Sequence, residues 1–210
     1  MNEPRRDRGW RRAVVAACLV ANAAGAVGQA TPKEVVDVMS SRVLEVLRDE
    51  SLSTETKRTQ VEEVIYQHVD FETLSRLVMG RNWRQLSDSE KKEFMVEFRR
   101  HLSDTYGENV DNYRNEKVSI LSAREEKRGD VTVKSKILRG GADDVIVNYR
   151  LRKKTDQWRI IDVVIEGVSL VANFRSQFQE IMTNGGPQRL LKLLREKNVG
   201  PPPGANPDPS

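Results

Sequence analysis

The hydrophobic period of this chain changes near Asn115, and this change constrains the fold more than any other feature of the sequence. Between Thr31 and about Val110, apolar residues recur three and four positions apart, which is typical of amphipathic helices. Between Glu116 and Glu166, apolar and polar residues alternate, as they do in strands with one buried face. Helices followed by strands predict an α+β fold with helices packed on a sheet.

Capping residues divide the helical region into four segments, of which the first runs from Pro32 to Arg48. Gly80 ends the third segment. The caps are Thr31 with Glu34, Ser53 with Thr54, Asp70, and Ser87 with Glu90. The fourth helix carries a bulky side chain at every fourth position: Phe94, Phe98, Leu102, Tyr106 and Val110. A stripe of this kind packs a core or lines a pocket, and composition alone favours the core.

Turn signals at Gly129-Asp130, Gly140-Gly141 and Thr155-Asp156 separate four candidate strands, and their short connections predict a four-stranded antiparallel sheet. Gly185-Gly186 and Pro187 divide the helical pattern that follows. We therefore expect one domain over residues 31–198, followed by a disordered Pro-rich tail over residues 199–210. Its parts are a helical region (31–113), a sheet (116–166) and C-terminal helices (168–198).

Residues 1–30 have the three parts of an export signal: a basic start, an apolar run from Ala13, and a stretch of small residues. The apolar run has roughly 15 residues, whereas a membrane-spanning helix needs about 20. This difference favours a cleaved signal peptide over the alternative of a membrane anchor. Cleavage fits after Ala26 or after Ala30, and it predicts a periplasmic protein.

The formal charge of +4 is concentrated in this leader, which holds five arginines against two acidic residues. The remaining chain is nearly neutral, which argues against a nucleic-acid partner. The single cysteine, Cys18, also lies in the leader. The residues before it faintly resemble a lipidation box, a lesser alternative because too few apolar residues precede it. A body without cysteine suits an oxidising compartment.

Candidate catalytic and metal-binding groups are few. His68 and His101 are the only histidines, and neither lies in a metal-binding motif. Ser169 lies in Gly-Val-Ser-Leu-Val, which departs from the nucleophile-elbow pattern, so we interpret it as a helix cap. The sequence therefore predicts neither a metal nor a cofactor.

Asp162 is the best candidate for a general base, because it lies in an apolar strand where burial perturbs a carboxyl group. The favoured alternatives are a structural ion pair, with Arg150 or Arg175, since a buried carboxylate needs a partner, or exposure on the outer face of the sheet. We therefore expect no catalytic residue.

Three stretches occur together in register: Leu77–Ser87, then Val147–Leu151 leading into Trp158–Leu170, then Asn173–Phe178 with Leu190-Leu191. Together they resemble the MlaC family of periplasmic phospholipid-binding proteins, also called toluene-tolerance auxiliary components of an ABC transport system. The Asp-Val-Val-Ile-Glu-Gly-Val-Ser-Leu run that begins at Asp162 is the most specific part. The resemblance covers roughly residues 31–198.

The resemblance implies a nuclear-transport-factor-like cone on a curved sheet, with extra N-terminal and C-terminal helices, whose cavity takes acyl chains and leaves the headgroup outside. It implies a soluble, monomeric phospholipid carrier and no enzyme activity. The carrier would shuttle lipid between an inner-membrane MCE-type ABC transporter complex and an outer-membrane lipoprotein, and so maintain outer-membrane lipid asymmetry. The direction of transport stays open. So do two other classes, an isomerase or dehydratase on the same cone and an exported protein-binding adaptor.

The candidate lipid-binding residues are apolar side chains of the helices and of the sheet. They are Leu74, Val78, Trp83, Phe94, Phe98, Leu102, Tyr106, Val147, Tyr149, Leu151, Ile160, Val163, Ile165, Val168 and Phe174. Arg81, Arg150 and Arg175 are candidates for a headgroup contact or a rim charge.

Overall fold

The computed structural model describes residues 29–107, 110, 113, 115–140 and 143–200. The first 28 residues of the expected leader and the last 10 of the expected tail lie outside the described residues. The elements are α1 (Pro32–Arg48), α2 (Thr54–His68), α3 (Phe71–Met79), η1 (Gly80–Gln85), α4 (Asp88–Tyr106), β1 (Lys117–Glu125), η2 (Lys127–Gly129), β2 (Val131–Leu138), β3 (Val145–Lys154), β4 (Gln157–Ile165), β5 (Val168–Ser169) and α6 (Leu170–Arg195).

The strands form one antiparallel sheet in the order β1-β2-β3-β4-β5, so the α+β prediction is confirmed. The expectation of four strands is wrong, because the described sheet has a fifth, two-residue strand. Glu166 and Gly167 adopt positive φ values of 47° and 84° and fold the chain sharply, so that Val168 pairs with Ile165. Two residues are too few to produce an alternating pattern. The cone-like shape stays a prediction.

Local capping chemistry determines where the helices begin. The hydroxyls of Thr31 and Ser87 accept hydrogen bonds from the third backbone N–H of α1 and α4, and the Glu side chains at those positions complete two capping boxes. Ser53 and Asp70 cap α2 and α3. All four expected N-caps are thus confirmed.

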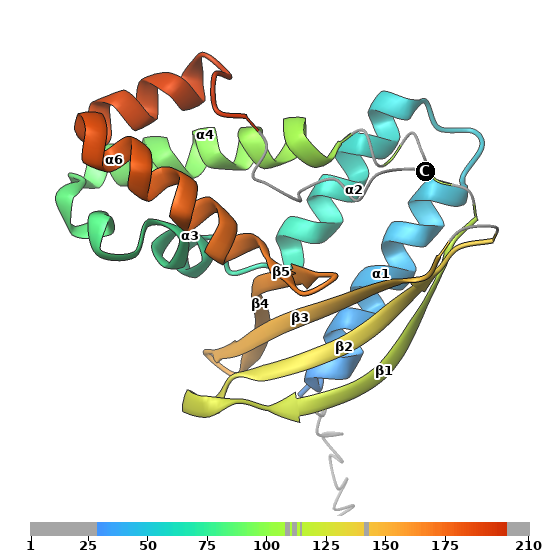
Figure 1. The fold of residues 1–210 in the computed structure, drawn as a ribbon. Coiled ribbons are helices and arrows are strands. Elements are labelled where there is room, and N and C mark those ends of the chain that lie inside the picture. Colours follow the sequence, from blue (N-terminus) through green and yellow to red (C-terminus); the bar gives the residue numbers. More distant parts are fainter. Residues whose placement is uncertain (1–28, 108–109, 111–112, 114, 141–142, 201–210) are drawn as a thin grey trace, which may run out of the picture.

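Helix α1 lies along one face of the sheet, as Figure 1 shows. Its apolar side packs on inward-facing strand residues, which the strand alternation places on one face. The buried members of this core are Val36, Met39, Val131, Val133, Leu151 and Ile160. This core fixes the sheet against the N-terminal helix.

A second core joins α3, α4 and α6 at the other end of the molecule (Figure 1). Helix α6 is broken at Gly186, where φ is 66° and ψ is −169°, so the glycine signal in the sequence marks a real break in this helix. Val199, which the sequence assigned to the tail, is buried in this core. The carbonyl oxygen of Gly200 accepts a hydrogen bond from Gln177 at 2.9 Å.

The link between α2 and α3 ties the helical part to the sheet. Val69 forms a bridge with Ile160 of β4, and the backbone N–H of Asp70 donates to the Ile160 carbonyl at 2.9 Å. The carboxylate of Asp70 also pairs with Lys154 at the end of β3. Among the described helices, none combines the length and apolar composition of a membrane span.

Candidate functional site

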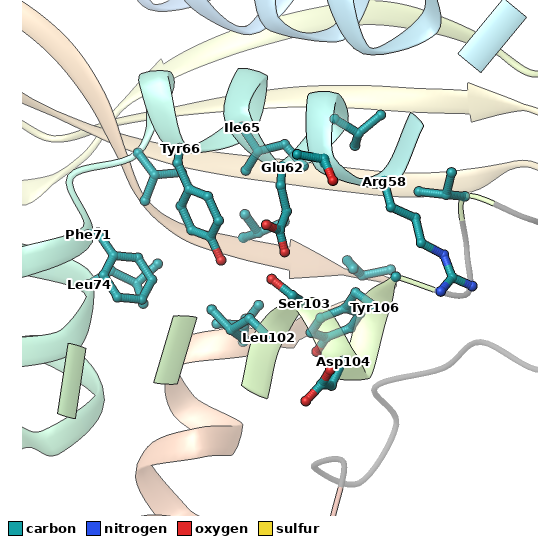
Figure 2. A pocket seen from close by; sticks show the side chains of 18 of the residues that line it. Arg58, Glu62, Ile65, Tyr66, Phe71, Leu74, Leu102, Ser103, Asp104 and Tyr106 are labelled. Carbon is teal, nitrogen blue, oxygen red and sulfur yellow. The ribbon is translucent and has the colours of Figure 1, made fainter. Parts of the chain in front are cut away.

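A cavity of about 480 Å³ opens between α2, the end of α4 and strand β4 (Figure 2). This volume lies within the range of about 300 to 1,000 Å³ that is usual for small-molecule pockets. The described lining residues are Glu55, Arg58, Thr59, Val61, Glu62, Ile65, Tyr66, Val69, Phe71, Leu74, Leu102, Ser103, Asp104, Tyr106, Gly107, Val110, Val163, Ile165 and Leu170.

The inner wall of the cavity is hydrocarbon. Ile65 from α2, Leu102 from α4, and Val163 and Ile165 from β4 each present a half-buried aliphatic side chain to it. Side chains that line an opening leave part of their apolar surface without protein contacts. A ligand that covers this surface gains about 25 cal/mol per Å² of apolar area, so the wall suits an apolar guest.

Two tyrosines stand where the apolar wall meets the rim. The Tyr66 hydroxyl donates to the carbonyl oxygen of Arg99 at 3.2 Å, and the Arg99 guanidinium lies 3.6 Å from the centroid of the Tyr66 ring. Burial raises the pKa of Tyr66, and burial also raises the pKa of Tyr106 to about 12. Both phenols are therefore neutral at physiological pH and add polar but uncharged groups to the wall.

Glu62 is the acidic side chain most affected by this environment. Its carboxylate is directed from α2 across the opening toward Ser103 of α4 (Figure 2). Burial raises the pKa of Glu62; Arg99 opposes this effect, and Asp104 and Glu55 add to it. The ionised carboxylate is thus less stable here than in water.

Five of the residues proposed from the sequence line the cavity: Leu74, Leu102, Tyr106, Val163 and Ile165. Four others are fully buried in the core formed by α3, α4 and α6, where Trp83 packs against them: Val78, Phe94, Phe98 and Phe174. Leu151 and Ile160 are buried beneath α1, with Tyr149 packed against them. Val147 is buried at 4% exposure, and Val168 on β5 is 40% exposed.

The three candidate arginines lie outside the described lining of this cavity. Arg150 donates two hydrogen bonds to the buried carboxylate of Asp130, of 2.8 and 3.0 Å. Arg175 donates to the carbonyl oxygen of Leu77 at 2.7 Å and so joins α6 to α3. Arg81 is exposed in η1.

Asp162 is paired differently from the expectation of an ion pair with Arg150 or Arg175. Its carboxylate accepts hydrogen bonds from the Ser169 hydroxyl at 2.7 Å and from the Val171 backbone N–H at 3.0 Å. The start of α6 thus supplies the donors that a buried carboxylate requires, although burial still raises the pKa of Asp162. Ser169 caps α6, as predicted.

Neither histidine lies in the cavity wall. His68 Nδ1 is hydrogen-bonded to the carbonyl oxygen of Val64 at 2.7 Å. His101 is buried against Phe174, its Nε2 has no hydrogen-bonding partner among the described residues, and burial lowers its pKa. In the described part of the chain, no three His, Cys, Asp or Glu side chains are grouped to hold a metal ion.

The α2 side of the cavity was not predicted from the sequence. Helix α2 contributes Val61, Ile65 and Tyr66. The link to α3 contributes Val69, α3 contributes Phe71, and α6 contributes Leu170. The apolar spacing of Val61, Ile65 and Val69 was the available signal. Charged residues are interleaved with these positions, so the sequence shows an ordinary surface helix.

The fold and the site together define a class of protein. It is an α+β protein with an apolar cavity between its helices and one strand of an antiparallel sheet. The family model described as MlaC protein matches residues 37–196. The chain therefore belongs to the MlaC family, and the family resemblance inferred from the sequence is confirmed.

Two curated relatives and one solved structure are similar to this chain. The intermembrane phospholipid transport system binding protein MlaC of Haemophilus influenzae is 23% identical over 69% of each chain. The toluene tolerance protein ttg2D of Pseudomonas putida is 24% identical over 56% of this chain and 55% of its own length. A phospholipid-binding protein from Ralstonia solanacearum, solved in complex with a phospholipid, superposes with a TM-score of 0.73. It is 24% identical, and the match covers 80% of this chain and 97% of that one.

Proposed function

We propose that this chain is a soluble periplasmic phospholipid carrier. The observation that carries the proposal is the apolar cavity of about 480 Å³ between α2, α4 and β4 in a fold of the MlaC family. Two similar proteins support it, one a phospholipid transport binding protein and one solved with a phospholipid. The acyl chains would lie against the aliphatic wall, and the headgroup would lie at the rim.

The energetics of acyl burial favour transfer by docking. Transfer of an acyl chain of about 15 methylenes from water to an apolar cavity is favourable by about 12 kcal/mol, at ~0.8 kcal/mol for each methylene. Release of such a ligand into water would be slow. The proposed carrier therefore delivers lipid to docked partners, an inner-membrane MCE-type ABC transporter complex and an outer-membrane lipoprotein, and so maintains outer-membrane lipid asymmetry.

Native mass spectrometry of the protein purified from the periplasmic fraction tests this function. We expect a bound mass equal to that of a phospholipid, on a chain that begins after Ala26 or Ala30. An empty protein, or a chain that keeps its first residues and stays in the membrane, would contradict the proposal. A bound metabolite of lower mass would instead support the isomerase or dehydratase alternative.

The Asp162→Asn variant distinguishes the carrier function from the enzyme alternative more directly. Asp162 lies outside the described cavity lining and is bonded to the start of α6. The variant should therefore keep its bound lipid, even if its stability falls. Loss of a measurable turnover in this variant would instead support the enzyme alternative.

A further inference from the structure

One end of the open face of the sheet is basic. Helix α1 packs on the other face, against Val133 and Leu151, and no described helix crosses the open face of β1, β2 and β3 (Figure 1). Because side chains alternate along a strand, the residues between those of the core point to the open face. The cations on this face and in the adjoining turn η2, which we call the basic face, are Arg124, Lys127, Arg128, Lys134, Arg150, Arg152 and Arg159.

Asp130 holds two of these cations in place. Its carboxylate is fully buried and accepts hydrogen bonds from Arg150 at 2.8 and 3.0 Å and from Arg152 at 2.7 and 2.9 Å. A guanidinium group has more N–H donors than these bonds use, and the two arginine side chains remain 41% and 36% exposed. One carboxylate thus orients two arginines, and the group keeps a net positive charge.

Most of the remaining cations have no carboxylate partner. Arg124 pairs with Glu126 at 2.7 Å. Lys127, Arg128 and Lys134 are exposed, and within the described part of the chain they form no ion pair. The chain after the leader is nearly neutral as a whole. Its positive charge is therefore concentrated on this face, where it produces a local positive potential.

Two arginines also face each other across neighbouring strands. Arg152 of β3 lies directly opposite Arg159 of β4. Arg159 donates to the backbone carbonyl of Gln67 and to the side chain of Gln157, which are both uncharged groups. Like charges that lie directly opposite each other destabilise a sheet. An anionic partner that covers this face would offset the cost.

The polar character of the basic face favours a lipid surface over a protein as this partner. The strand residues paired with Arg124, Lys134 and Arg150 include Thr132 and Asn148, which are small and polar. Stable protein interfaces centre on buried apolar and aromatic anchors, and these positions provide none. An anionic bilayer needs no such anchor, because it attracts each nearby Lys or Arg electrostatically and its phosphates accept hydrogen bonds from guanidinium groups.

We propose that the basic face docks the protein on anionic phospholipid membranes, an interaction that goes beyond lipid binding in the cavity and does not depend on it. The guanidinium groups of Arg150 and Arg152 contact lipid phosphates, and the surrounding cations add attraction. The cavity is lined by Val163 and Ile165, which alternate onto the opposite face of β4. Docking thus concentrates the protein at a membrane without covering this part of the cavity wall.

Co-sedimentation with lipid vesicles tests the proposal. The full mature protein is mixed at about 0.1 M salt with vesicles of phosphatidylcholine alone, or with vesicles that contain equal parts of phosphatidylcholine and phosphatidylglycerol. The wild type should bind only the anionic vesicles. It should be released at about 1 M salt, because the Debye length falls from about 10 Å to about 3 Å.

A triple variant weakens the basic face and leaves the arginines on Asp130 intact. It combines Lys127→Gln, Arg128→Gln and Lys134→Gln, which are exposed positions whose change should not affect folding. Each cation near an anionic surface contributes about a fivefold gain in binding, so this variant should bind the anionic vesicles roughly a hundredfold more weakly than the wild type.

The matched control combines Arg42→Gln, Arg84→Gln and Lys92→Gln, which remove the same charge from exposed positions on α1, η1 and α4. It should bind as the wild type does. Equal binding of the wild type to both kinds of vesicle, or equal binding of the two triple variants, would overturn membrane docking. Binding to neither kind would also overturn it and would favour an acidic protein as the partner. Native mass spectrometry of the same preparations counts the lipid in the cavity, so a failure of the carrier function is seen separately.

Discussion

Helix α4 meets two different environments along one stripe of side chains. Phe94 and Phe98 are fully buried, and their rings stack with centroids 5.4 Å apart. One and two turns further on, Leu102 and Tyr106 are only half-buried and line a cavity. The spacing is the same in both halves, so the stripe itself does not determine whether the space beside it is filled.

The facing elements account for the difference. Helix α6 places Phe174 and Phe178 against Phe98, with ring centroids 5.1 and 5.4 Å away, and these rings fill the space. Toward the end of α4, the facing side chains of α2 and β4 include the smaller aliphatic residues Ile65 and Val163. Bulky partners thus make a core beside α4, and aliphatic partners leave a cavity.

The largest effect on stability is expected in the filled region. Phe98→Ala removes a ring that contacts four others and leaves a hole that its neighbours cannot close, so the free energy of unfolding should fall by about 3 to 5 kcal/mol. Chemical denaturation measures this change. Val96→Ala, on the exposed side of the same helix, should change it by less than about 0.5 kcal/mol. A loss below about 1 kcal/mol for Phe98→Ala would mean that this region is not tightly packed.

A smaller effect depends on pH and on His101, which packs against Phe174 in this region. Burial lowers the pKa of His101, so the folded protein keeps the ring neutral while the unfolded chain takes up a proton below about pH 6.5. Stability should be constant above that pH and decline as the pH falls below it, until the folded pKa is reached. Denaturation of wild type and His101→Leu at about pH 7.5 and 5.5 checks this. The wild type should lose more stability on acidification, and equal losses would show that His101 does not contribute.

A still smaller effect is expected at the start of α4, which leads into both regions. Ser87→Ala removes the capping box with Glu90, and the free energy of unfolding should fall by about 1 kcal/mol. Thermal denaturation of this variant beside Ser176→Ala, an exposed position within α6, measures it. The same small change in both variants would show that the cap is dispensable.

The elements that the sequence predicted are those that local interactions decide. The capping boxes at Thr31 and Ser87 need only residues three positions apart, and the break at Gly186 needs only a positive φ. The strand β5 was missed because a two-residue strand has no period. The partner of Asp162 was missed because the sequence does not show that the start of α6 folds back over β4.

Some of the residues proposed from the sequence line the candidate cavity, and others do not. Leu102 and Val163 were proposed from their apolar patterns, and both line the cavity. Phe94 and Phe174 were proposed on similar patterns and lie in a packed core. Only the tertiary arrangement separates the two groups, because it decides which side chains face one another across the interior. The wall that α2 provides, with Ile65, belongs to a helix whose sequence looks like a surface.

Bound lipid measured together with melting temperature in Val163→Trp tests the central claim most directly. The indole should occupy the cavity, so the variant should fold with a melting temperature within a few degrees of wild type and lose most of its co-purified lipid. Val164→Trp, on the opposite face of β4, should keep its lipid. Ile65→Trp enters the cavity from α2 and repeats the test should Val163→Trp unfold. A folded Val163→Trp or Ile65→Trp protein that binds as much lipid as wild type would contradict the assignment of the cavity between α2, α4 and β4 as the lipid site.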